Sequence, residues 1–155
     1  MNYEANVVMA KPTDSDIVGE LVYALLFEFY ADQSHLFSLD KMKKTAAELL
    51  GTESGVWSFL AMSGDEVVGM INLNECSAIY AGGKFGEITE LYIKPEFRSQ
   101  NIGEELISQA KRFAKERRWN VLEVGAPNVP RYQRTVNFYL KNGFSEIGPR
   151  LELDV

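Results

Sequence analysis

The chain has 155 residues, a length that predicts one domain, and its 46% hydrophobic content is enough to form a core, which excludes a disordered polypeptide. A net charge of −6 argues against a nucleic-acid partner, because non-specific binding needs a basic face, and no apolar run approaches the roughly 20 residues that span a membrane. The one cysteine, Cys76, cannot form an internal disulfide, which suits a reducing compartment, so we expect a cytoplasmic protein. With one histidine, His35, and no cluster of cysteine and histidine, a zinc site is not expected.

The first half of the chain predicts a strand, two helices and a β-hairpin. Apolar residues between 17 and 29 recur at helical spacing, and Thr13 followed by Asp16 forms a capping-box pattern before them. Ser38 is a candidate cap for a second helix that Gly51 ends. The predicted elements are a strand over 6–11, helices over 17–29 and 39–50, and strands over 56–62 and 66–75 joined by a turn at 63–65.

The second half alternates strands and helices around a central strand that ends at Pro95, because a proline cannot donate to a sheet. Asn142 and Gly143 form a left-handed cap pattern after the last helix. The order predicts a mixed α/β fold with three successive antiparallel strands and then a parallel pair. The predicted elements are strands over 87–93 and 119–124, helices over 102–114 and 131–141, and final strands over 144–147 and 149–153.

The turn between the central strand and the next helix has the features of an anion site. Its sequence is Arg98-Ser99-Gln100-Asn101-Ile102-Gly103. A loop that opens a helix directs backbone N–H groups to one point, and the first helical turn adds unpaired N–H groups and a partial positive charge. These features predict a phosphate or diphosphate ligand, with Gly103 allowing close approach and Arg98 adding a full positive charge.

This run resembles the acyl-CoA-binding motif of the GNAT acetyltransferase superfamily, Arg/Gln-x-x-Gly-x-Gly/Ala after a strand that ends in a short x-Pro turn. Arg98 and Gly103 match its first and last positions, whereas Asn101 and Ser99 stand where the family commonly has glycine. Asparagine is the non-glycine residue best able to adopt the left-handed conformation, so the loop can still form. The resemblance implies the GNAT fold, a mostly antiparallel mixed sheet with flanking helices, whose parallel fourth and fifth strands splay apart to admit acyl-CoA.

The same resemblance implies acetyl-CoA as the acyl donor and assigns residues to it. The strand segment 91–93 would hold the pantetheine arm, and backbone N–H groups at a break in that strand would polarise the acetyl carbonyl. Where many members have an asparagine in the last helix this chain has Tyr132, and Asn137 is a nearby polar substitute. The implied cofactor-binding residues are Leu91, Tyr92, Ile93, Arg98, Ser99, Gln100, Asn101, Ile102, Gly103, Glu104 and Asn137.

A second motif, from Phe138-Tyr139 to Gly143-Phe144, resembles the C-terminal helix of the same family, in which the tyrosine serves many members as general acid. When an amine attacks a thioester, coenzyme A leaves as a thiolate, and a phenol can donate a proton to that sulfur at neutral pH. We expect Tyr139 to have this role; the alternative is a tyrosine that only packs beneath its helix. Phe138 and Phe144 are expected to be core residues.

Glu87 and Glu90 are the candidates for the general base that deprotonates the substrate ammonium. They are three residues apart and therefore face opposite sides of an ideal strand, unless a bulge intervenes. One common family position of this glutamate corresponds to Thr89, and we favour Glu90, with a solvated or ion-paired carboxylate as the alternative. Glu123 on the next strand is a lesser candidate for binding a cationic substrate.

We therefore predict an N-acetyltransferase that moves an acetyl group to a small-molecule or peptide amine. Direct attack in a ternary complex is expected, because no positioned cysteine or serine indicates a covalent acyl-enzyme. The alternative is a non-catalytic acyl-CoA-binding or sensor module of the same fold. A Rossmann-type enzyme is disfavoured, since the chain lacks Gly-x-Gly-x-x-Gly. Edge strands expected at the C-terminus are compatible with a homodimer.

Overall fold

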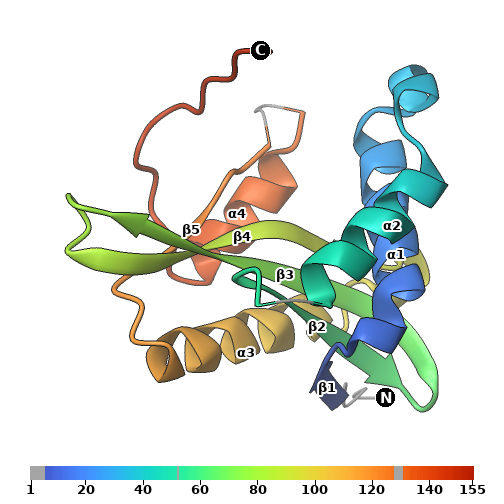
Figure 1. The fold of residues 1–155 in the computed structure, drawn as a ribbon, viewed down its shortest axis with the longest axis horizontal. Helices are drawn as coiled ribbons and strands as arrows, with labels where there is room; N and C mark the ends of the chain where they lie inside the picture. Colours follow the sequence, from blue (N-terminus) through green and yellow to red (C-terminus); the bar gives the residue numbers. More distant parts are fainter. Residues whose placement is uncertain (1–5, 52, 128–130) are drawn as a thin grey trace. The chain divides into compact units, whose positions relative to one another are not determined.

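The computed structural model describes residues 6–51, 53–127 and 131–155 (Figure 1). By their internal contacts these residues form two compact units, one that ends at Glu123 and one that begins at Val124. No helix in the described ranges is long and apolar enough to cross a membrane. The elements are β1 (Asn6–Met9), η1 (Pro12–Asp14), α1 (Ser15–Phe29), η2 (Ala31–Leu36), α2 (Leu39–Leu50), β2 (Val56–Ser63), β3 (Glu66–Ala78), β4 (Gly83–Ile93), η3 (Pro95–Phe97), α3 (Ile102–Glu116), β5 (Leu122–Val124) and α4 (Gln133–Lys141).

Five strands form one sheet in the order β1-β2-β3-β4-β5. The first four are antiparallel neighbours. The last pair is parallel, since the amide of Gly86 donates to the carbonyl of Val121 at 3.0 Å and the amide of Asn120 donates to that of Lys84 at 3.4 Å. These bonds lie near the beginning of β4. The mixed sheet with its parallel pair confirms the predicted fold class.

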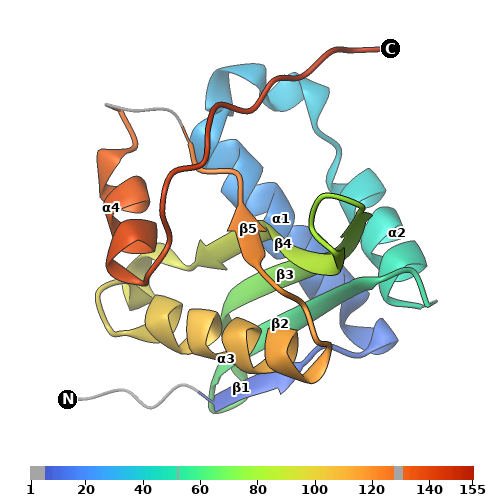
Figure 2. The ribbon, with the colours of Figure 1, turned by 90° about the vertical axis from the view of Figure 1, so that its left-hand side faces the viewer.

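Helices of the first unit cover both faces of the sheet (Figure 2). On one face, Phe113 of α3 contacts Phe59 of β2 edge-to-face, with ring centroids 5.2 Å apart. Successive strand residues point to opposite faces, so Leu60 enters the core on the other side, under α1. That second cluster consists of Val18, Leu21, Leu60, Met70 and Tyr92. Both halves of the core therefore depend on the central strands.

The two N-terminal helices cross closely at Gly19. A Cβ atom added there would lie 2.7 Å from the backbone of Lys43 in α2, so only glycine permits this approach. Ser38 caps α2 as predicted, because its hydroxyl accepts from the amide of Lys41 at 3.2 Å. The capping box predicted at Thr13 is wrong. A 3₁₀ turn precedes α1, and the carboxylate of Asp14 accepts from the amide of Lys11 at 2.7 Å instead.

The C-terminal segment differs most from the prediction of two final strands. Residues 144–155 contain no strand, although strands were expected over 144–147 and 149–153. The apolar alternation is present, but a strand needs a hydrogen-bonded neighbour, and Gly148, with φ at +133°, together with Pro149 interrupts the run. Its alternate apolar side chains are consequently 78–119% exposed, namely those of Ile147, Leu151, Leu153 and Val155. The predicted strand over 119–124 is also shorter, since β5 begins at Leu122, and Trp119 is buried ahead of it.

Candidate functional site

The loop between η3 and α3 adopts the conformation that an anion site needs. Ser99 and Asn101 both have φ at +65°, in the left-handed region that favours glycine. Asn101 is the N-cap of α3 and makes no side-chain cap bond. Helical hydrogen bonding begins where the amide of Glu105 donates to the carbonyl of Asn101 at 3.1 Å. The amides of residues 102–104 precede that bond, so they are the helix-terminal donors available to a ligand.

A surface hollow lies beside this loop at the beginning of α3. It is lined by Asn101, Glu104, Glu105, Ser108 and Arg112. Its charged groups are the carboxylates of Glu104 and Glu105 and the guanidinium of Arg112, which also donates to Gln109 at 3.0 Å. Ile102 by contrast is 2% exposed and anchors the beginning of the helix in the core.

Arg98 is held by α1. Its two terminal nitrogens donate to the two carboxylate oxygens of Glu28 at 2.8 and 2.7 Å, and its Nε donates to the carbonyl of Ile93 at 2.9 Å. The guanidinium also lies 5.6 Å from the ring centroid of Tyr92. Its hydrogen bonds to Glu28 lower the pKa of that carboxyl below the usual range, although partial burial opposes the shift. Arg98 therefore ties the loop to α1 and to the end of β4.

A β-bulge in β4 decides where the candidate bases lie. Asn72 pairs with Glu90 and Leu73 pairs with Ile88, so Thr89 is the extra residue. Because of this insertion, Glu87 and Glu90 face the same side of the sheet, although their spacing alone predicts opposite sides. The central strand thus has an irregularity at Thr89, shortly before the segment Leu91–Ile93.

Two rows of polar side chains cross the sheet on that face. In the first, Ser58 pairs with Asn72, which pairs with Glu90. The Nδ2 atom of Asn72 donates to Glu90 at 3.2 Å, and the hydroxyl of Thr89 donates to the same carboxylate oxygen. In the second row, Glu87 pairs with Asn74. The sequence analysis did not identify Asn72 and Asn74 as neighbours of the two glutamates. Asparagine at alternate positions of an otherwise apolar strand is the signal that could have identified them.

Cys76 continues this polar face but does not fit a nucleophile. Its Sγ atom lies 3.9 Å from a carboxylate oxygen of Glu87, and the amide of Asn74 donates to it at 3.5 Å. Burial, followed by the negative charges of Glu87 and Glu123, raises the pKa of the thiol. A thiol that resists ionisation is a poor nucleophile.

Tyr139 lies in the second unit and is 7% exposed. Its ring contacts Phe138 and Phe144 edge-to-face, at centroid distances of 5.4 and 5.5 Å. Burial raises the pKa of Tyr139 to about 12, so the phenol keeps its proton throughout the physiological range. Asn137 lies two residues earlier, and its Oδ1 accepts from Gln133 at 2.8 Å. Tyr139 is therefore a protonated phenol that can donate a hydrogen bond, while the raised pKa makes it a weaker acid than a free tyrosine.

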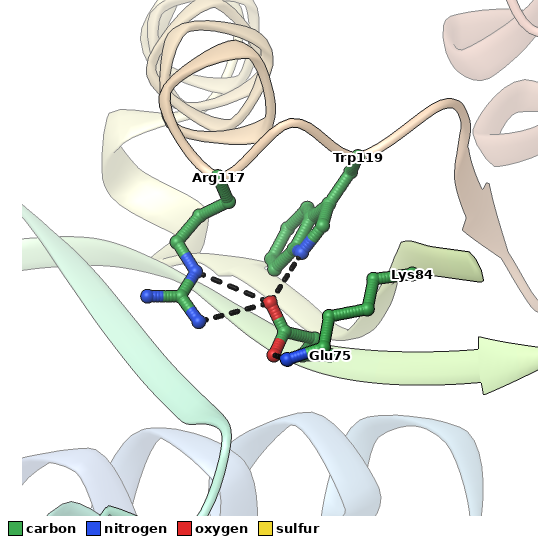
Figure 3. Close-up of polar contacts among 4 residues, drawn as sticks. All are labelled: Glu75, Lys84, Arg117 and Trp119. Atoms are coloured by element: carbon green, nitrogen blue, oxygen red, sulfur yellow. Dashed lines mark hydrogen bonds and ion pairs between the residues drawn. The ribbon is translucent and has the colours of Figure 1, made fainter.

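A carboxylate that sequence reasoning did not single out, Glu75, joins three elements (Figure 3). It accepts from Lys84 at 3.1 Å, from Arg117 at 3.0 and 3.2 Å, and from the indole of Trp119 at 2.6 Å. Burial would raise the pKa of Glu75, but the bonds from Trp119, Lys84 and Arg117 together lower it to about 2. Arg117 also stacks over Trp57, 4.5 Å from the ring centroid. This network fixes the turn into β5. Trp119 is buried in the core, and half-buried Trp57 packs against it with ring centroids 6.0 Å apart.

The comparisons with known proteins agree with this geometry. Residues 20–144 match the family model described as the acetyltransferase (GNAT) family. An aminoalkylphosphonate N-acetyltransferase from Salmonella typhimurium strain LT2 is 34% identical over 101 residues, which make up 65% of this chain and 63% of that protein. The chain thus spans less than two thirds of the length of this curated relative.

Solved structures share the fold at low sequence identity. A possible acetyltransferase from Clostridium difficile 630 superposes with a TM-score of 0.81 at 18% identity, covering 97% of each chain. A ribosomal-protein-alanine N-acetyltransferase from Brucella melitensis biovar Abortus 2308 superposes with a TM-score of 0.74 at 18% identity, covering 98% of this chain and all of that one. At this identity the likeness concerns the fold alone.

Proposed function

Because this chain belongs to the GNAT acetyltransferase family, we propose that it transfers an acetyl group from acetyl-CoA to a primary amine in a ternary complex. The observation that supports acyl-CoA binding best is the loop before α3. Ser99 and Asn101 adopt the left-handed conformation, which costs a non-glycine residue about 1 kcal/mol. Strain of this kind persists where the surrounding structure and the function require it.

The residues of this chain divide the chemistry between them. The backbone amides of the loop 98–104 would hold the diphosphate, and the strand segment Leu91–Ile93 would hold the pantetheine arm. Bound acetyl-CoA supplies the acetyl thioester, whose C–S bond breaks as the C–N bond to the acceptor forms. Glu90 would accept one proton of the acceptor ammonium, and Tyr139 would donate its proton to the departing thiolate sulfur. The second proton that the nitrogen loses as the amide forms would restore the phenol.

The first test is binding. Coenzyme A at a hundredfold excess over its Kd should stabilise the folded protein by about 2.7 kcal/mol, whereas NAD and ATP should leave the melting temperature unchanged. Turnover of acetyl-CoA is then measured with a panel of amines, which includes an aminoalkylphosphonate because of the relative of that name. Stabilisation by NAD or ATP equal to that by coenzyme A would contradict the assignment of the loop.

The second test concerns the proton donor. Tyr139→Phe keeps the buried ring and removes the hydroxyl, so kcat should fall about 100-fold while coenzyme A binding is retained. Tyr23→Phe is the matched control, since Tyr23 stacks on Phe27 within α1 and has no assigned role in the chemistry. Equal kcat values for Tyr139→Phe and the unmodified protein would show that the phenol only packs beneath its helix.

A further inference from the structure

The sheet face beneath α1 changes from apolar to polar along β3. At Met70 it belongs to the buried cluster of α1, whereas Asn72, Asn74 and Cys76 follow on the same side at alternate positions. A sheet face next to the core normally stays apolar, because a buried polar group without a partner costs about 1–3 kcal/mol. Asn74 and Cys76 are half-buried and hydrogen-bonded to each other and to Glu87, so this cost concerns the fully buried part of the face.

Two buried polar atoms on this face still need partners. Ser58 is 1% and Asn72 is 6% exposed, yet the hydroxyl of Ser58 and the Oδ1 atom of Asn72 have no hydrogen-bond partner in the described part of the chain. The two residues are directly paired across β2 and β3. Both atoms can accept a hydrogen bond, and the carboxylate of Glu90 lies next in the row. Three adjacent acceptors suit a ligand that offers several N–H donors, as an amine does.

A second carboxylate lies farther along the same face. Glu87 pairs with Asn74, two residues beyond Asn72 on β3, which puts the two rows roughly 7 Å apart. Glu123 on the next strand adds negative charge at this end of the face, because its charge, like that of Glu87, raises the pKa of the Cys76 thiol. The face is thus negative at both ends of a short span.

We propose that this face, defined by Ser58, Asn72, Asn74, Glu87 and Glu90, binds an acceptor with two amino groups. The nitrogen to be acetylated lies at Glu90, Asn72 and Ser58, and the second, charged nitrogen lies at Glu87. The inference rests on the proposed function and narrows it to short aliphatic diamines and longer polyamines. An acceptor with an anionic group, such as an aminoalkylphosphonate, is disfavoured by the same carboxylates.

The test compares acetylation of 1,4-diaminobutane, butylamine and 2-aminoethylphosphonate. The diamine should have a kcat/KM about tenfold above that of butylamine, which lacks the second charge, as expected for one added ion pair. Glu87→Gln should remove most of this advantage, chiefly through the KM of the diamine. Glu116→Gln, which removes an equal charge from an exposed position at the end of α3, should keep it.

Preference for the phosphonate, or a diamine advantage that survives in Glu87→Gln, overturns the inference and leaves the proposed function standing. Calorimetric titration with 1,4-diaminobutane separates the remaining outcomes. If no amine is acetylated but the diamine binds and Glu87→Gln weakens that binding, the cation site holds and the proposed reaction fails. If no amine is acetylated and the diamine does not bind, both are overturned.

Discussion

Single residues decide how charge is distributed in this protein, and Glu75 is the clearest case. Its side chain is 10% exposed and accepts from three donors, which lower its pKa from 4.5 to about 2. A shift of this size corresponds to about 3 kcal/mol of stability at neutral pH. Because the folded-state pKa is the lower one, this stability is present above pH 4.5 and is lost as the pH falls toward 2.

Glu75→Gln should therefore lower the free energy of unfolding at pH 7 by about 2–3 kcal/mol, and the deficit should shrink by pH 3. Urea unfolding at the two pH values measures both quantities. Glu66→Gln is the control, since its bridge to Lys94 is exposed and should be worth at most about 1 kcal/mol. A deficit that stays constant with pH would mean that shape, and not charge, makes Glu75 important.

At this scale the sequence predicted backbone conformation better than side-chain contacts. The left-handed conformation of Asn101 followed from the residue type, and the structure confirms it. The partner of Arg98 could not be predicted, because Glu28 is 70 positions away in the chain and the pair forms only once α1 packs. The roles of Tyr139 and Glu90 stay predictions until turnover is measured.

Whole elements are coupled by a few close contacts, and the ion pair between Glu28 of α1 and Arg98 before α3 is one of them. If Arg98 acts by holding the loop, Glu28→Gln should raise the Kd for coenzyme A about threefold, the effect of one exposed ion pair. If the guanidinium itself binds the diphosphate, the same change frees it and the Kd should fall. Titration calorimetry with coenzyme A distinguishes the two directions.

The crossing of α1 and α2 gives a second test among the elements. Gly19→Ala would raise intrinsic helix propensity by about 1 kcal/mol, yet the new Cβ would lie 2.7 Å from the backbone of Lys43. We expect the cost of this overpacking to exceed the gain in helix propensity, so the free energy of unfolding should fall by about 1–2 kcal/mol. A higher urea midpoint would show instead that α2 can move away at little cost.

Element positions were largely predictable because they depend on local patterns. The periods of the apolar residues located α1, α2, α3 and the three antiparallel strands, and Ser38 marked a helix start. The bulge at Thr89 has no comparable local signal, since it depends on pairing with β3. The strands expected after residue 143 failed for a related reason: alternation shows that a segment can form a strand, but not that a partner exists.

For the molecule as a whole, the order of elements was enough to predict the mixed sheet and, through the resemblance, the family. The comparisons confirm that family over residues 20–144. A homodimer and a single domain over all 155 residues stay predictions, and the first has lost the terminal strands on which it rested. The polar face that we propose for the acceptor is built from separate strands, so the sequence pattern alone could not identify it.

The extra residue in β4 makes this strand intolerant of changes in length. Phe85 and Ile88 are buried before it and Tyr92 is buried after it, so the strand is anchored on both sides of residue 89. Deleting Thr89 would restore a regular pleat and rotate one anchored half by 180°, exposing its core residues and turning Glu87 away from Glu90. The side chains along this strand can therefore vary more freely than their number, because a change in length would disrupt the core on one side of residue 89.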